Sequence, residues 1–208
     1  MTPLICIDPG HPSEVGPGTR GKVVTEIHAA WREAVLLRKI LRHDGYRVVF
    51  TKGSEHQFVA NKRRSEVANR RHAALMIRLH CDCSTSTGFT IYYPDRQGQD
   101  GARLGPTLAV LQSSEVAARA FYPAFKARLN GALADNGLLP DAKTMVGSQH
   151  GALVGSIYAK EPVLLVEMAT LTNPFDEKFM RSRAGERLMA RALAAGTEAA
   201  LKALRGSQ

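Results

Sequence analysis

The sequence predicts a single α/β domain, built on a mixed, largely parallel and twisted sheet with helices on both faces. Short apolar runs at 4–8 and 162–167 are typical of buried strands. Amphipathic stretches at 25–43 and 184–204 have helical spacing and alternate with such runs along the chain. The 208 residues, 44% hydrophobic and 23% charged, suit one hydrophobic core. We therefore expect residues 1–208 to form one domain.

The N-terminal part predicts a strand, a loop, a helix and a second strand. The run at 4–8 is followed by a loop rich in Gly and Pro. Thr25 can cap a helix over 25–43, because its hydroxyl can accept a hydrogen bond from the first helical turn. Gly45 ends this helix, and 46–51 has the composition of a strand.

The middle of the chain predicts a helix over 58–73 and a strand over 74–80. A polar loop separates this strand from an alternating strand at 88–93. The segment 94–106 is rich in Gly, Asp and Gln, and its length and composition favour a mobile or substrate-facing loop.

The C-terminal part predicts an Ala-rich helix over 113–136, ended by Gly137. The pattern between this helix and the next strand is weak, although 153–159 could form a strand. The run at 162–167 is the clearest buried strand, and 184–204 is an amphipathic terminal helix. No internal repeat or linker indicates an additional module.

Charge and hydropathy narrow the class of protein. The formal charge of +9 suits an anionic partner or surface, but the basic segment 61–72 lacks the interleaved aromatic residues of a nucleic-acid groove. No stretch approaches the roughly 20 apolar residues of a membrane-spanning helix. The start of the sequence shows no signal peptide, so either none is needed or one has been removed. We expect no nucleic-acid partner and no integral membrane segment.

The three cysteines cannot form a disulfide framework. Cys81 and Cys83 flank Asp82 directly after His80, so a thiolate metal site is an alternative. On a strand, however, His80 and Asp82 share one face and both cysteines the other. This alternative is therefore the weaker one, and Cys6 is expected to pack in the core.

Four acid–base or metal-binding side chains are expected to meet at one edge of the sheet. His11, His80 and Glu167 each follow an apolar run, where the carboxyl ends of strands converge on a ligand crevice. Glu26 begins the helix after the first strand and can face back across the loop. Two imidazoles and one carboxylate can hold a catalytic zinc ion with one position open. The sequence thus predicts Zn²⁺ held by His11, Glu26 and His80.

The fourth side chain, Glu167, predicts the reaction type. Zinc polarises a carbonyl and lowers the pKa of a bound water to about 7, but amide hydrolysis also requires a proton on the leaving nitrogen. Glu167 could take a proton from the water and return it to the amine. A carboxylate that merely capped the next segment would be costly after so apolar a strand. The residues alone therefore predict a zinc hydrolase.

These motifs, in this order, resemble the zinc-dependent N-acetylmuramoyl-L-alanine amidases of the amidase-3 family over nearly the whole chain. The resemblance implies an α/β fold, zinc bound by His11, Glu26 and His80, and Glu167 as the catalytic carboxylate. The matching segments are Asp8–His11, Glu26, Arg64–Asn69, Arg78–Asp82, Gly88–Tyr93 and Leu165–Asn173.

The resemblance also implies the substrate, which is the amide between the lactyl group of N-acetylmuramic acid and L-alanine in peptidoglycan. Location in the periplasm or elsewhere in the cell envelope follows from that substrate. Some relatives carry a helical insertion that blocks the metal until a partner removes it. Residues 137–162 show no such amphipathic segment, so we expect an active monomer that requires no activator.

Three departures from the family pattern concern the walls of the site. Arg78 replaces a small Ser, Cys81 and Asp82 stand where Ala and Asn are common, and Met168 begins an altered segment after Glu167. The family's usual Arg ahead of the last strand is not evident, although His150 is near that place in the sequence. The alternatives are another zinc peptidase or amidase, or a wall-binding protein with this fold and little catalysis.

Overall fold

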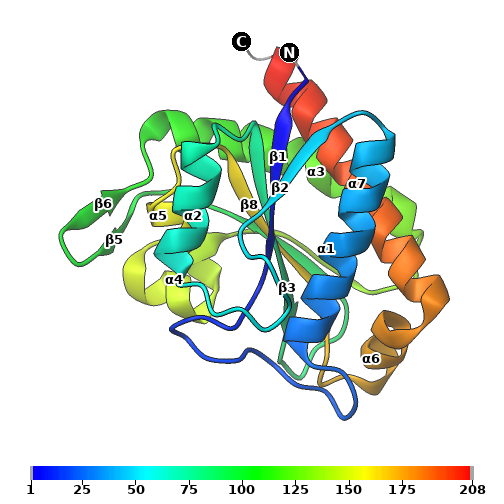
Figure 1. The fold of residues 1–208 in the computed structure, drawn as a ribbon. Helices are drawn as coiled ribbons and strands as arrows, with labels where there is room; N and C mark the ends of the chain where they lie inside the picture. Colours follow the sequence, from blue (N-terminus) through cyan, green and yellow to red (C-terminus); the bar gives the residue numbers. More distant parts are fainter. Residues whose placement is uncertain (1, 207–208) are drawn as a thin grey trace.

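A mixed six-stranded sheet organises the computed structural model, which describes residues 2–206 (Figure 1). The strand order is β2-β1-β3-β8-β4-β7. The first four of these strands are parallel, and β4 runs antiparallel to β8 but parallel to β7. The prediction of a mixed, largely parallel sheet is confirmed. The strands are β1 (Leu4–Pro9), β2 (Arg47–Phe50), β3 (Leu75–Asp82), β4 (Phe89–Tyr93), β7 (Asp135–Pro140) and β8 (Val163–Thr170).

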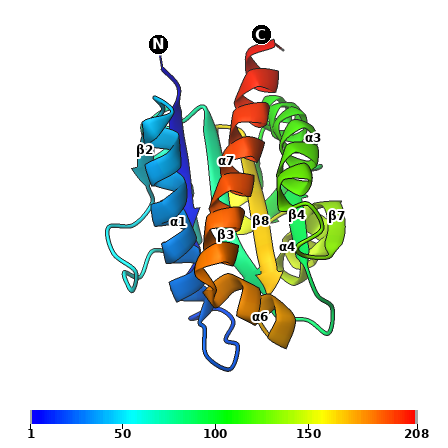
Figure 2. The same ribbon diagram turned by 90° about the vertical axis from the view of Figure 1, so that its right-hand side faces the viewer.

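Helices cover both faces of the sheet, as predicted. The helices α1, α3 and α7 lie side by side over one face (Figure 2). The shorter helices α2, α4 and α5 lie on the other side, and α6 lies beside the lower end of α7 (Figure 1). Among residues 2–206, no helix has both the length and the apolar character to cross a membrane. The helices are α1 (Glu26–His43), α2 (Asn61–Arg70), α3 (Leu108–Leu129), α4 (Met145–His150), α5 (Val154–Ile157), α6 (Pro174–Arg181) and α7 (Arg183–Gly206).

Strand alternation gives the two faces different characters. On the face under α1, α3 and α7, Ile5, Ile77 and Val166 are fully buried in the main core. The opposite face begins apolar, with Cys6 packed in a smaller cluster, and becomes polar toward the carboxyl ends of the strands. The chemistry-bearing residues of the central strands therefore gather on this second face.

Two expectations for the segments around α3 are wrong. The helix expected over 113–136 is Leu108–Leu129, because Asn130 adopts a left-handed conformation (φ 50°) that ends it. The following edge strand β7 was missed, since it contains Gly137 and its residues are exposed or partly exposed, so no apolar run marks it.

Two further expectations concern loops. The segment 94–106 is not an open loop but a hairpin of β5 (Gly98–Asp100) and β6 (Arg103–Gly105). The expected strand over 153–159 is wrong as well, because helix α5 occupies this region. A short 3₁₀ helix, η1 (Asp141–Lys143), precedes α4, so 141–157 forms a compact helical connection between β7 and β8.

Candidate metal centre and its cavity

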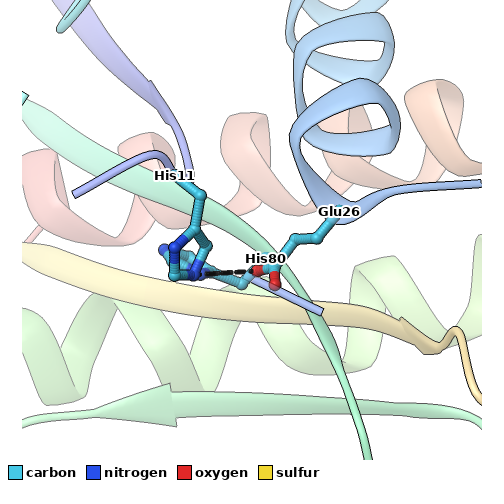
Figure 3. Close-up of side chains that lie close together, drawn as sticks. All are labelled: His11, Glu26 and His80. Atoms are coloured by element: carbon cyan, nitrogen blue, oxygen red, sulfur yellow. Dashed lines mark hydrogen bonds and ion pairs between the residues drawn. The ribbon is translucent and has the colours of Figure 1, made fainter. Parts of the chain in front are cut away.

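The carboxyl ends of β1, β3 and β8 bring the four predicted side chains together. In the sheet, Asp8 pairs with Arg78, and two residues further along β3 His80 pairs with Glu167. His11 follows β1, and the first turn of α1 places Glu26 over the same edge (Figure 3). The structure therefore brings these side chains together at one edge of the sheet, as the sequence predicted.

His11 is held by its own loop. It adopts a left-handed conformation (φ 47°), and its Nδ1 lies 2.9 Å from the carbonyl oxygen of Gly16. Nδ1 is therefore the protonated nitrogen, which leaves the lone pair on Nε2. Nε2 lies 3.5 Å from Glu26 Oε1, so the nitrogen that carries the lone pair faces the carboxylate.

The carboxylate of Glu26 is held by His80 and by the backbone N–H groups of Thr19 and Cys81, in addition to His11. Thr25 caps α1 as predicted, accepting a hydrogen bond from the His28 N–H. Glu26 Oε2 accepts a hydrogen bond from the Thr19 N–H at 2.7 Å. Burial alone would raise the pKa of Glu26, but the hydrogen bond and charge of His80 outweigh it, with help from His11 and Thr19, and lower the pKa. The carboxylate form, which can bind a cation, is thus favoured.

His80 lies beside this carboxylate. Its Nδ1 is 2.9 Å from Glu26 Oε1, and the same oxygen accepts a hydrogen bond from the Cys81 N–H at 3.1 Å. Burial lowers the pKa of His80, so the neutral imidazole required of a metal ligand is favoured. Its Nε2 is buried and makes no hydrogen bond to any described residue.

The donor atoms of His11, Glu26 and His80 fit a tetrahedral cation. All three lie within 4.8 Å of one another (Figure 3). Ligands about 2.0–2.1 Å from a tetrahedral zinc ion are about 3.3 Å apart. Glu26 Oε1 lies 3.5 Å from His11 Nε2, close to that value, whereas its 2.9 Å separation from His80 Nδ1 is that of a hydrogen bond. Two imidazole nitrogens and one carboxylate oxygen are a donor set that could hold a metal ion such as zinc.

Two glycines make room for these ligands. A Cβ atom on Gly10 would lie 2.7 Å from Cε1 of His80, and one on Gly18 would lie 2.6 Å from Oε2 of Glu26. Gly18 also has φ +80°, a conformation that other residues rarely adopt. Both positions therefore require glycine if the ligands are to keep their places.

Glu167 lies next to His80 on the neighbouring strand. Its Oε2 atom is buried without a hydrogen-bond partner among the described residues. Burial, followed by the negative charges of Glu26 and Asp82, raises the pKa of Glu167 well above its ordinary range, and Arg78 opposes this shift. A carboxyl group with a raised pKa can exchange protons near neutral pH.

The four residues line one cavity of about 560 Å³. The hairpin at 94–106, expected to face substrate, contributes nothing to its wall. The connection between β7 and β8 lines it instead, and sequence patterns missed this because its helices are too short to show periodicity. The wall residues from this connection are Lys143, Thr144, Met145, Val146, Leu153 and Val154.

A buried ionic network lies beneath the cavity. Asp8 accepts hydrogen bonds from Arg64 Nη1 at 2.7 Å and from Arg78 Nε at 3.1 Å. These side chains are 0%, 1% and 4% exposed, in that order. Arg64 also donates to the carbonyl oxygens of Pro9 and Pro12, which flank His11. Arg64 thus ties the loop that carries the first ligand to β1.

Cys6 and His150 lie apart from this centre, whereas Cys81 and Cys83 contribute to the wall of the cavity. Cys81 is buried in the main core, on the face of β3 opposite His80, as the alternation predicted. Burial raises the pKa of its thiol, which disfavours the thiolate that a metal requires. His150 is partly exposed, its Nδ1 lies 3.0 Å from the Gln99 carbonyl oxygen, and it does not line the cavity.

Comparison with known proteins places the chain beside one kind of enzyme. The family profile described as N-acetylmuramoyl-L-alanine amidase (Amidase_3) matches residues 5–199. The amidase Ami1 of Mycobacterium smegmatis has 22% sequence identity and a TM-score of 0.75, covering 99% of this chain and 98% of that one. The amidase AmiC2 of Nostoc punctiforme has 20% identity and a TM-score of 0.72, covering 94% and 95%.

The CwlD amidase of Clostridioides difficile, solved in complex with the GerS lipoprotein, has 17% identity and a TM-score of 0.71, with 97% and 99% covered. No curated protein sequence matches the chain. At these identities the solved structures establish a shared fold.

Proposed function

Because this chain belongs to the amidase-3 family of N-acetylmuramoyl-L-alanine amidases, we propose that it is a zinc-dependent peptidoglycan hydrolase. The bond cleaved is the amide between the lactyl group of N-acetylmuramic acid and L-alanine. The zinc ligands are His11, Glu26 and His80, and Glu167 is the general base and acid. Residues 1–208 act as one catalytic domain.

One observation carries this proposal. A single oxygen, Glu26 Oε1, lies 2.9 Å from one imidazole nitrogen and 3.5 Å from another, inside a cavity that Glu167 also lines. Backbone groups hold two of these ligands in place, since Gly16 fixes the ring of His11 and Thr19 fixes the carboxylate of Glu26. Such support of metal ligands from outside the coordination sphere is typical of metal sites.

The protein's own groups supply orientation and proton transfer. A bound zinc ion would provide Lewis acidity, polarising the carbonyl and lowering the pKa of water to about 7. Glu167 accepts the proton of the attacking water and delivers it to the departing nitrogen of L-alanine. Its raised pKa makes Glu167 a stronger base toward the water, and a pKa closer to neutral pH than that of an ordinary carboxyl lets the same group return the proton.

The cavity is open to solvent-sized molecules although helices α4 and α5 border it. We infer that the enzyme acts without an activator, as a monomer, in the periplasm or another part of the cell envelope. Because the CwlD amidase was solved with a lipoprotein partner, the basal turnover of this protein should be measured without any partner. Strong stimulation by a partner, over negligible basal turnover, would contradict it.

Digestion of purified peptidoglycan by the zinc-loaded protein tests the proposal. Mass spectrometry should find free stem peptides that begin with L-alanine. A chelator-treated sample and the Glu167→Gln variant should release none, while the variant keeps its zinc. Glu115→Gln, which changes an exposed carboxylate on α3, is the matched control and should remain active. Release that persists in Glu167→Gln would refute the assigned role.

A further inference from the structure

We propose that Arg78 is a specificity-determining residue that binds a carboxylate of the peptide substrate at the floor of the cavity. This inference rests on the proposed amidase function and adds the chemistry by which the peptide is selected. Arg78 is on β3, two residues before the ligand His80, and its side chain lines the cavity.

The first argument is the charge balance beneath the cavity. Arg64 and Arg78 share the single carboxylate of Asp8. Lys52, also buried, contacts only backbone carbonyl oxygens by hydrogen bond, those of Gly10, His11 and Glu55. Asp141 and Glu167 also feel the charge of Arg78, but among the described residues Arg78 donates a hydrogen bond to neither of them. A carboxylate of the substrate would give Arg78 a hydrogen-bonded anion that it does not share with Arg64.

The second argument is the orientation of the guanidinium group. Nε of Arg78 donates to Asp8, and Nη2 donates to Asn61 Oδ1 at 2.7 Å. The remaining nitrogen, Nη1, lies against Gly155, where a Cβ atom would be only 2.7 Å from it. Such a Cβ atom would also lie 2.7 Å from Cζ, so glycine at this position keeps a side chain off one face of the guanidinium. Asn61 also lines the cavity, so a carboxylate that reaches Arg78 meets an amide beside it.

The third argument is the distance from the reaction. On the same face of the sheet, Arg78 is one row behind the pair formed by His80 and Glu167. Two residues of a strand span about 6.7 Å. Two residues of an extended peptide span about 7 Å. A peptide whose first amide lies at Glu167 would therefore bring the backbone carboxylate of its second residue to Arg78.

A purely structural role for Arg78 would show a different result. If Arg78 is removed, Asp8 keeps its ion pair with Arg64 and its hydrogen bond from Thr51, so no buried carboxylate is left unpaired. Arg78→Met should therefore fold and bind zinc. Loss of Arg78 also removes a charge that lowers the pKa of Glu167, which changes the turnover of both substrates alike. The preference for a charged substrate should change as well, because a carboxylate gains a charge-assisted hydrogen bond that a carboxamide does not.

The experiment compares two N-acetylmuramoyl dipeptides that begin with L-alanine. They differ only at the second residue, which carries a free α-carboxylate in one and a carboxamide in the other. Zinc-loaded wild type should show a kcat/KM about 10- to 100-fold higher for the carboxylate. Arg78→Met should bring this ratio close to one, and Arg78→Lys should restore part of it. A ratio that Arg78→Met leaves unchanged would overturn the inference.

Binding separates this inference from the proposed function. Calorimetric titration of both dipeptides into the zinc-loaded Glu167→Gln protein, with and without Arg78→Met, requires no turnover. If wild type hydrolyses neither dipeptide, the amidase function fails for these substrates, but tighter carboxylate binding that depends on Arg78 still supports the inference. Equal binding of the two dipeptides, or none, overturns it. Should Arg78→Met fail to fold, Gly155→Ala retains the charge but displaces the guanidinium, and should also reduce the ratio.

Discussion

Asp141 makes the stability of the cavity wall depend on pH. It begins η1, is 1% exposed, and its Oδ2 accepts a hydrogen bond from the Leu153 N–H at 3.2 Å. Burial raises the pKa of Asp141 from 3.8 to about 6, against the opposing effects of Ser156, Leu153 and Arg78. This carboxyl ties both ends of the helical connection that borders the site.

The direction of the pH dependence follows from the pKa of Asp141, which is about 6 in the folded protein and 3.8 in the unfolded chain. The folded protein holds the Asp141 proton more tightly than the unfolded chain, so its contribution is fully present below about pH 4. It is lost as the pH rises through about 6. A shift of about two units, at about 1.4 kcal/mol each, corresponds to about 3 kcal/mol of stability lost by pH 8.

Asp141→Asn tests this linkage, because the amide keeps the acceptor oxygen but cannot ionise. Urea unfolding of variant and wild type from pH 4 to 8 should give a difference in unfolding free energy that changes steeply between pH 4 and 6 and is constant above about pH 7. Between pH 4 and 7 the difference should move by about 2 kcal/mol in favour of the variant. Glu115→Gln, at an exposed carboxylate, should show little such movement. Parallel stability curves for wild type and Asp141→Asn would refute the reasoning.

Three further substitutions test the site and its support. Gly10→Ala should displace the His80 ring and weaken zinc binding at least about tenfold, measured by competition with a chelating dye. Unchanged zinc affinity would contradict the requirement for glycine beside the His80 ring. Arg64→Met should lower the free energy of unfolding by about 3–5 kcal/mol, because the carbonyl oxygens of Val59, Pro9 and Pro12 lose their buried donor. A loss below about 1 kcal/mol in urea unfolding would be inconsistent with this. Glu33→Met should stabilise the protein by about 1–3 kcal/mol at pH 8, since both oxygens of this buried carboxyl lack hydrogen-bond partners among residues 2–206 and burial raises its pKa. Thermal denaturation that shows destabilisation would count against it.

The sequence predicted the centre of the fold better than its edges for a physical reason. Strand β8 is buried on both faces and therefore appears as an uninterrupted apolar run, which also marks Glu167 at its end. The helix cap at Thr25 placed Glu26 correctly, because capping depends on neighbouring residues alone. Strand β7 and helices α4 and α5 depend on contacts with distant segments, so their residues carry no local periodicity.

The ionic network was invisible for the same reason. Asp8 belongs to a strand, Arg64 to a helix and Arg78 to another strand, and only the register of β1 against β3 brings them together. The sequence marked Arg78 merely as a departure from the family pattern. The charge of Arg78 becomes informative once its burial is known, because solvent would screen the charge of an exposed arginine.

The network also gives a physical reason why His11, the proposed zinc ligand in a loop, is held in place. His80 is positioned by sheet hydrogen bonds, whereas His11 lies beyond the end of β1 in a left-handed conformation. Arg64 compensates by donating to the carbonyl oxygens of Pro9 and Pro12 on both sides of it. A ligand fixed before the metal binds loses little conformational freedom on binding. The hydrogen bonds of buried Arg64 therefore favour zinc binding at the proposed site. Arg64→Met should weaken zinc binding even under conditions where the protein remains folded.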